Sequence, residues 1–391
     1  MSTSVKFFNS DMPGAPQCSG TAGAMLSVLD ACLVTGFGLQ TAASTSIATG
    51  VCTLTLPTTP AMQVGSVALV AGATPASLNG EQRVTAITAN TVSFATAEPD
   101  GAPTGTITIK LAPAGWLKPF SGTNTAAYKI DPALHPDGTG IFLKVDDTTT
   151  FNARIWGYET LSDISTGTGE FPTTAQKTLY VFKSEAANAV AKPWLVVCDD
   201  RMVYVGVRHY NTDNNSYAPS WWCFGEFASK KTADPYRFVV SGNYPNTSST
   251  GSDQSYSIAS TTNTEFSYLA RSYTALGGGV KSVNATWPSS YGGSGSDVAP
   301  LAYPNGADYG LYLSPADIME QGSPQTLRGR LPGMLMIPHR LLRKICPDAK
   351  TAYLDSAVPG YPGRTIGFMP CADSGTNWGV VAFDLTGPWE H

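Results

Sequence analysis

Charged residues are scarce in this 391-residue sequence, at 14% against about 25% in an ordinary soluble domain. The formal net charge is −5, so no overall basic field exists that would hold a phosphate backbone. No run approaches the ~18 apolar residues of a membrane span, and the N-terminus lacks the charged and apolar regions of a secretory signal. These absences predict a soluble protein that binds no nucleic acid and has no membrane span.

Sequence motifs for catalysis and for cofactor binding are also missing. No H-E-x-x-H pair, no G-x-S-x-G elbow and no phosphate-binding loop occurs. Gly36-Phe37-Gly38 lacks the third glycine of a dinucleotide site. The chain has four histidines, at positions 135, 209, 339 and 391. We therefore expect no catalytic residue, no cofactor and no bound metal.

The cysteines suggest a reducing environment during assembly. Seven are scattered without any C-x-x-C spacing, at positions 18, 32, 52, 198, 223, 346 and 371. An odd number leaves at least one thiol unpaired within a chain. We expect reduced, buried thiols in a protein that is assembled in the cytosol.

What the sequence has in abundance is glycine (39), proline (28) and aromatic residues (10%). This mixture suits short strands joined by turns better than long helices, so it predicts a mainly β fold of sandwich or barrel domains. One N-terminal helix is expected over about residues 22–34, where apolar residues recur at three- and four-residue spacings until Gly36. A shorter helix is expected over Arg340–Cys346, closed by Pro347.

The composition shifts to Ala, Thr, Val and Gly between about residues 40 and 112. Five strand-like runs separated by turns predict a small β-sandwich or barrel there. Asn79-Gly80 marks one turn, because this pair supplies the positive φ that a tight connection needs. We interpret 40–112 as a module inserted into a discontinuous main domain, 1–39 and 113–391.

The main domain contains ten further strand candidates with turn residues between them, which favours antiparallel or mixed sheets over a βαβ series. Two stretches, 243–263 and 282–297, are rich in Ser, Thr, Gly and Asn. We expect long exposed loops there, which serve either as passive linkers or as partner contacts.

Two acidic pairs, Asp146-Asp147 and Asp199-Asp200, each end an apolar strand. Paired carboxylates can perform acid–base chemistry, because like charges held together raise one pKa. Aspartate also accepts backbone hydrogen bonds in turns, and this second interpretation is favoured. The alternating oxygen donors over 211–215 resemble half of a calcium loop, but the required glycine and bidentate glutamate are absent.

Aromatic residues gather between positions 204 and 227. They can line a groove that stacks on sugar rings, or they can form the core of a β-sandwich, which is the favoured interpretation. The candidates for a glycan or partner contact are Trp221, Trp222, Tyr217 and Tyr210.

Several phrases spread over nearly the full length resemble a family of uncharacterised virion proteins encoded among the structural genes of tailed phages and prophages. They are VKFFNSDMPGAPQCSGTAGAMLSVLDACLVTGFG, GWLKPFSGTNTAAYK, AKPWLVVCDDRMVYV, LRGRLPGMLMIPH and WGVVAFDLTGPWE. Within the insert, VGSVALVAGATPASLNG followed by RVTAIT resembles a small β module of many phage tail and appendage proteins.

The resemblance implies a virion component with no catalytic residue to carry over. We expect a structural protein of the tail, tail tip or baseplate that assembles with copies of itself, in symmetric oligomers, and with other virion proteins. A receptor-binding appendage that recognises bacterial surface glycan is one alternative. A capsid-decorating or head-to-tail connector protein is another, and a polysaccharide depolymerase that uses an acidic pair is the least favoured.

Overall fold

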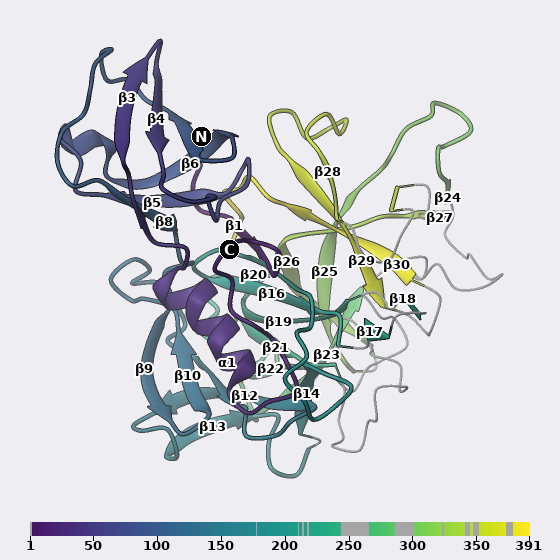
Figure 1. Cartoon of the computed structure of the whole chain (residues 1–391). Helices are drawn as coiled ribbons and strands as arrows, with labels where there is room; N and C mark the ends of the chain where they lie inside the picture. The colour runs from purple at the N-terminus through teal and green to yellow at the C-terminus, as the bar shows by residue number, and fades with distance from the viewer. Residues whose placement is uncertain are drawn as a thin grey trace.

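The computed structural model describes residues 2–176, 178–209, 211–212, 215–216, 219–243, 266–285, 301–322, 324–340, 345–346, 352–372 and 378–391. The described chain is mainly β, as its composition predicts, and has one short α-helix (Figure 1). No helix in these ranges is long and apolar enough to span a bilayer.

The largest sheet has thirteen strands and joins the N-terminal strand to the C-terminal third of the chain. Its twelve-strand path is antiparallel throughout, and β20 (Ala228–Ser229) pairs with β26 beside it. In spatial order the path runs β1 (Lys6–Asn9), β15 (Trp194–Cys198), β16 (Met202–Val207), β19 (Ser220–Glu226), β21 (Phe238–Ser241), β22 (Ser267–Leu269), β23 (Val280–Ala285), β25 (Ser314–Glu320), β26 (Thr326–Met336), β30 (Trp378–Asp384), β29 (Ile366–Ala372) and β28 (Tyr353–Asp355).

A six-stranded antiparallel sheet lies beside the N-terminal helix (Figure 1). Its order is β13 (Gly167–Phe171), β12 (Asn152–Leu161), β11 (Phe142–Asp146), β10 (Thr125–Lys129) and β9 (Leu117–Gly122), with β14 (Leu179–Phe182) also paired to β12. Two small two-stranded ladders also occur: antiparallel β17 (Asn211–Thr212) with β18 (Asn215–Ser216), and parallel β24 (Leu301–Ala302) with β27 (His339–Arg340).

A seven-stranded sheet draws all its strands from Gln40–Leu111. Its order is β2 (Gln40–Thr41), β8 (Thr108–Leu111), β5 (Val67–Ala71), β6 (Gly80–Ile87), β7 (Thr91–Ala95), β4 (Val51–Thr55) and β3 (Ser44–Ala48). A register shift between Val84 and Ala86 bends β6, so the sheet curls. The Leu111 amide donates to the Phe37 carbonyl at 3.0 Å, so the chain enters and leaves this sheet at adjacent points.

The helix α1 (Ala24–Leu29) continues as a π-helical turn, η1 (Asp30–Thr35), and Gly36 follows with φ 68°. Its first turn has no cap from its own sequence neighbours. Instead the Asp147 Oδ2 accepts the backbone N–H groups of Met25 at 2.7 Å and Leu26 at 3.2 Å. A carboxylate at this end satisfies donors that the helix itself leaves unpaired.

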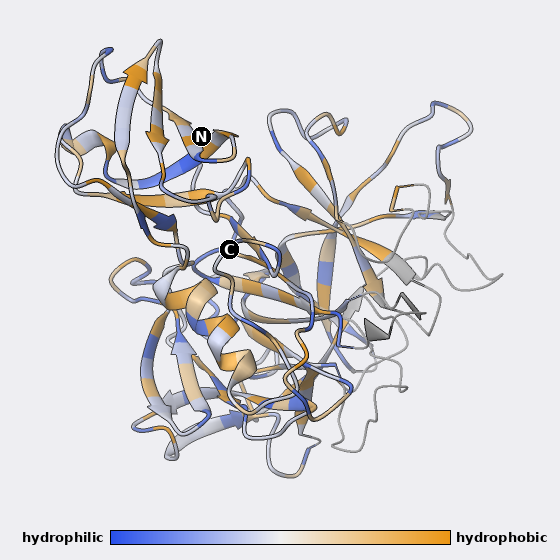
Figure 2. Ribbon diagram, in the orientation of Figure 1, coloured by the Kyte–Doolittle hydropathy of each residue, from blue (hydrophilic) through white to orange (hydrophobic). Residues whose placement is uncertain are grey.

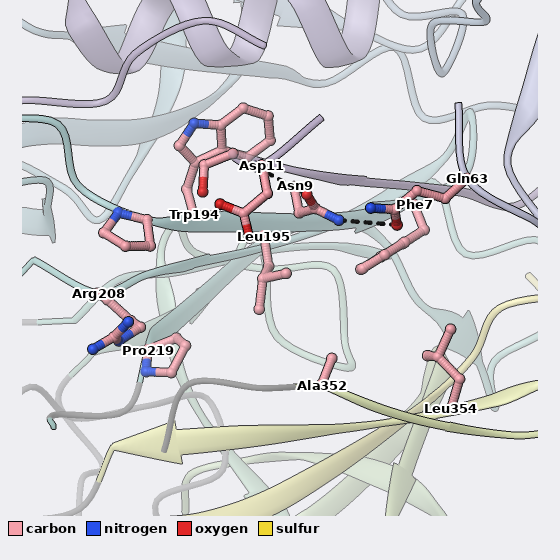
Figure 3. Close-up of a pocket in the computed structure, with 12 residues that line it drawn as sticks. Phe7, Asn9, Asp11, Gln63, Trp194, Leu195, Arg208, Pro219, Ala352 and Leu354 are labelled. Carbon is pink, nitrogen blue, oxygen red and sulfur yellow. Dashed lines mark hydrogen bonds between the residues drawn. The ribbon is translucent and has the colours of Figure 1, made fainter. Parts of the chain in front are cut away.

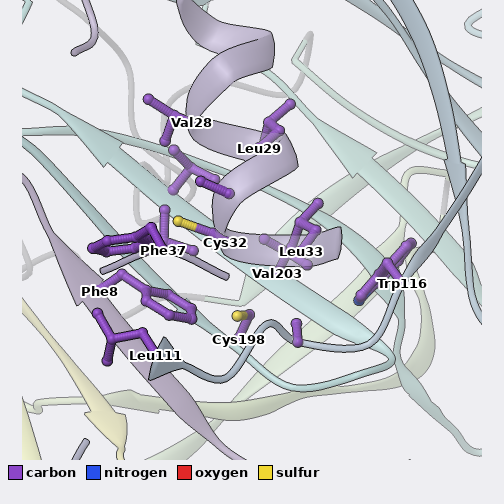
Figure 4. Packing of buried hydrophobic residues seen from close by; sticks show 14 of the residues in the cluster. Phe8, Val28, Leu29, Cys32, Leu33, Phe37, Leu111, Trp116, Cys198 and Val203 are labelled. Carbon is purple, nitrogen blue, oxygen red and sulfur yellow. The ribbon is translucent and has the colours of Figure 1, made fainter. Parts of the chain in front are cut away.

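The buried face of α1 and η1 belongs to one hydrophobic core with strands from all three main sheets. Figure 4 shows residues of the large sheet and of the seven-stranded sheet beside it. Leu33 lies beside Val203 of β16, and Phe37 lies beside Phe8 of β1 with ring centroids 5.9 Å apart. Figure 2 shows hydrophobic segments, coloured orange, along the helix and the strands beneath it. This core explains the three- and four-residue spacing in the sequence.

Several expected elements differ from the structure. The expected helix over 340–346 is not found: Arg340 ends β27, residues 341–344 lie outside the described residues, and the described Ile345 and Cys346 are not helical. Residues 282–285 belong to β23 although a loop was expected, because pairing with β25 overrides their polar composition. The rest of both expected loops, 244–263 and 286–297, also lies outside the described residues.

The Asn79-Gly80 turn agrees only in part with the expectation from the sequence. Gly80 has the expected positive φ of 93°, whereas Asn79 is extended and uses its side chain to bond both backbone groups of Ala73.

All seven cysteines are buried, as predicted. Burial raises the pKa of the Cys18 thiol to about 12 and that of Cys52 to about 11, so both stay protonated at neutral pH.

Candidate functional site

The two tryptophans proposed for glycan contact lie in the core. Trp221 and Trp222 on β19 have no exposed surface and point to opposite faces of the large sheet. The Trp221 Nε1 donates to the Pro370 carbonyl at 2.9 Å, and the Trp222 ring stacks on Phe224 with centroids 5.6 Å apart. A ring without exposed surface cannot stack on a sugar, so this placement favours the core interpretation.

The sequence could not separate these two roles, because β19 is buried on both faces and every residue in it is apolar or enclosed. An alternating pattern would have marked one face as exposed. The other two candidates, Tyr210 and Tyr217, lie outside the described residues, as does Asp213 of the calcium-like segment.

The first acidic pair is occupied by structural contacts. Asp146 accepts the Thr148 amide at 3.1 Å and pairs with Arg154 at 2.5 Å. Asp147 caps α1 and forms an ion pair with Lys183, and neither side chain of that pair has exposed surface. The two neighbouring carboxylates therefore have separate cationic partners.

The second acidic pair fixes the β15–β16 turn to distant segments. Asp199 accepts the amides of Arg201 at 2.9 Å and Met202 at 2.7 Å, which is the turn role that the sequence favours. Its second oxygen lies 2.7 Å from the His391 Nε2, and Asp200 lies 2.8 Å from the His135 Nε2. Both carboxylates tie chain segments together.

The other two histidines are enclosed. Burial lowers the pKa of His209 to about 4, and its ring stacks on Phe182 with centroids 4.5 Å apart. His339 accepts the Tyr312 amide through Nε2 at 2.7 Å, so its Nδ1 carries the proton and donates to Ala302. No group of three or more potential metal ligands occurs within the described ranges.

A pocket of about 230 Å³, here called the β1–β28 pocket, lies where three parts of the chain meet (Figure 3). Phe7 and Asn9 of β1 and Leu195 of β15 come from one end of the large sheet. Gln63 comes from the segment that leads into β5, and Leu354 comes from β28 at the other end of the sheet. The pocket therefore exists only after residues far apart in sequence have packed.

Three polar side chains of this pocket, Asn9, Asp11 and Gln63, lie along one side of it, and Arg208 lies apart from them (Figure 3). The Asn9 Nδ2 donates to the Gln63 Oε1 at 3.2 Å, and the Asn9 Oδ1 accepts the Asp11 amide at 3.0 Å. These contacts orient both amide side chains. Asp11 and Gln63 are exposed, and within the described part of the chain neither the Asp11 carboxylate nor the Gln63 Nε2 has a hydrogen-bond partner. Arg208, 7% exposed, also lines the pocket.

A second surface feature is the 271–279 loop between β22 and β23. Leu276 is 72% exposed and Tyr273 is 42% exposed. The loop is nevertheless fixed at its base: Arg271 binds both Glu159 oxygens at 2.5 and 2.7 Å, and Gln176 donates to the Gly279 carbonyl at 2.5 Å. Rigid polar contacts therefore hold two large apolar side chains out in solvent.

Sequence reasoning did not find the β1–β28 pocket or the 271–279 loop. Asp11, Gln63, Tyr273 and Leu276 belong to no motif, and their role depends on neighbours that are distant in sequence. No pattern in the sequence marks them.

No protein-family model matches the chain, and no curated protein matches it. Among solved structures, the phage phi92 endosialidase is a weak structural neighbour with 10% sequence identity and a TM-score of 0.16. The comparison covers 90% of this chain and 52% of that protein, so the chain spans about half the length of the endosialidase. At this TM-score the likeness supports no conclusion about fold or activity.

Proposed function

We propose that this chain is a structural component of a tailed-bacteriophage particle, in the tail, tail tip or baseplate, that acts through protein–protein assembly. The phage-like sequence phrases and the mainly β fold support this role. Its partners are copies of itself and other virion proteins. The observation that carries the proposal is the distribution of large apolar side chains on the surface.

Thirteen large apolar side chains are exposed in the described part of the chain, and seven of them lie between Tyr273 and Leu354. Four of these seven are tyrosines, at positions 273, 309, 312 and 353. Tyrosine is enriched at protein interfaces, because it offers a large contact area and loses little conformational entropy. The region that Figure 1 draws from green to yellow is therefore the assembly surface in this proposal.

Within this surface, the 271–279 loop allows the most specific test of the proposal. A loop whose base is already fixed by Arg271 and Gln176 loses little backbone entropy when a partner covers it. We expect the double variant Tyr273→Ser, Leu276→Ser to be excluded from particles, while its folding is unchanged. The matched control is Leu134→Ser, a 58% exposed leucine on another loop.

The test is to produce particles from a genome that encodes each variant, purify them, and measure the chain by mass spectrometry. Electron microscopy of labelled chain then separates a tail position from a capsid-decorating or connector position. If the unaltered chain is missing from purified particles, the proposal fails. If both variants enter particles equally, the 271–279 loop is not the contact.

We also propose that the module 40–112 is a separate unit that projects from the particle. Its strands pair only with one another among the described residues, and Figure 1 shows its sheet at one end of the folded molecule. Because Phe37 and Leu111 are hydrogen-bonded, a short linker can replace residues 41–112. Particles should assemble with this deletion; complete failure to assemble would contradict a projecting role.

A second candidate function is a receptor-binding appendage for bacterial surface glycan. The observation that favours it is the β1–β28 pocket, where a carboxylate and an amide nitrogen are open to a ligand. Loss of adsorption to host cells by particles that carry pocket variants, with particle assembly intact, would support this function.

A further inference from the structure

We propose that the β1–β28 pocket binds one ring of a neutral saccharide. This inference rests on the second candidate function and deepens it, because it names the class of ligand that the same pocket takes. Of the residues used here, the assembly surface shares only Leu354, and the test uses the isolated chain. The pocket, at about 230 Å³, is smaller than the sites of drug-sized ligands. It therefore suits a single sugar ring, either free or at the end of a longer chain.

The open polar groups match hydroxyl chemistry. A hydroxyl both donates and accepts hydrogen bonds, so it is satisfied by one acceptor and one donor on the protein. In this pocket the Asp11 carboxylate is the acceptor and the Gln63 Nε2 is the donor. Asn9 fixes the Gln63 amide through its oxygen, which leaves the nitrogen directed to a ligand.

The apolar walls match the C–H faces of a sugar ring. Phe7 and Leu195 are half-buried on the sheet side, and Leu354 is 45% exposed on β28 opposite them (Figure 3). A ring placed between these walls removes apolar surface from water on both sides, while its hydroxyls reach the polar edge.

The charges of the pocket favour a neutral ligand. Among the described residues of the lining, Asp11 contributes one negative charge and Arg208 one positive charge, so these residues carry no net charge. An anionic ring would be attracted by Arg208 and repelled by Asp11, and a cationic ring the reverse, so the lining gives no net preference for a ring of either charge. A polyhydroxylated ring without charge meets neither repulsion.

The experiment is ligand-observed saturation-transfer NMR with the full chain. The probes are free glucose, galactose, mannose, N-acetylglucosamine and N-acetylgalactosamine, with glucuronic acid and glucosamine as charged comparators. We expect at least one neutral sugar to bind with a dissociation constant on the order of 1 mM, as is usual for so small a ligand.

The double variant Asp11→Ala, Gln63→Ala should weaken that binding by at least about tenfold, because two ligand hydrogen bonds are lost. Leu354→Trp should block binding by filling the pocket. The control Gln325→Ala, an exposed glutamine away from the pocket, should bind like the unaltered chain. Circular dichroism confirms that each variant is folded.

Three results would overturn the inference. They are no transfer to any neutral sugar at about 50 mM, equal binding by the double variant and the control, and preferential binding of a charged comparator. None of them bears on whether the chain enters particles, so this proposal and the assembly proposal can fail separately.

Discussion

Replacing Asp147 by asparagine perturbs an ion pair beside the six-stranded sheet in which neither side chain has exposed surface. Asp147 lies just after β11, caps α1 and pairs with Lys183, whose side chain has no exposed surface. Lys183 also donates to the Thr21 carbonyl at 2.7 Å. Asparagine keeps an oxygen for the helix amides, so the variant removes mainly the negative charge.

The expected cost follows from the burial of the remaining charge. Removing one partner of a buried ion pair destabilises a protein by about 3–5 kcal/mol, because the other charge stays buried without compensation. The matched control is Asp146→Asn, next in sequence, whose partner Arg154 is 35% exposed. An ion pair open to solvent is worth about 1 kcal/mol or less.

Adding Lys183→Met to Asp147→Asn removes the uncompensated charge. We expect this second change to restore about 2 kcal/mol, offset in part by the loss of the bond to Thr21. The assay is equilibrium unfolding in urea, followed by tryptophan fluorescence, with midpoints compared at equal slope. The reasoning is refuted if Asp147→Asn costs no more than Asp146→Asn, or if Lys183→Met lowers stability further.

Three other predictions concern stability and accessibility. Burial lowers the pKa of His209 to about 4, below the value of about 6.5 in an unfolded chain. The free energy of unfolding should therefore fall by about 1.4 kcal/mol per pH unit as the pH drops from 6.5 towards 4. The variant His209→Gln should show a smaller difference in unfolding free energy between pH 7 and pH 5. Arg83→Ala should cost about 2–3 kcal/mol, because its guanidinium donates to backbone carbonyls near both chain ends, and calorimetry should show earlier melting than in Arg83→Lys. Alkylation of the native chain should leave Cys18 and Cys52 unmodified until denaturant is added; rapid labelling in the native state would contradict their burial.

The individual elements of the fold were largely predictable. The strand candidates VCTLTLP, SVALVA, GIFLKVDD, NARIWGYE and PWLVVCDD correspond to β4, β5, β11, β12 and β15, because each strand must bury at least one face. The helix was predictable from its apolar spacing, although its last turn is π-helical. The long strand β26 was missed, because Pro332 and Gly333 interrupt its apolar pattern within the strand.

The pairing of those elements was not predictable from local patterns. β1 pairs with β15 across nearly two hundred residues of sequence, and β28 closes the opposite end of the same sheet. Which strands pair depends on how whole sheet faces pack. The sequence of a strand that is buried on both faces does not indicate which strands lie beside it. For the same reason, the sequence of β19 did not show whether Trp221 and Trp222 lie in the core or on the surface.

By itself the sequence determined a mainly β chain with buried thiols and one N-terminal helix, since composition and local spacing fix which residues avoid water. Only the tertiary structure decided that Asp147 meets a buried lysine, that a loop holds Leu276 in solvent, and that Asp11, Gln63 and Leu354 share one pocket. Such contacts join residues distant along the chain, and their geometry is set by the packing of complete sheets.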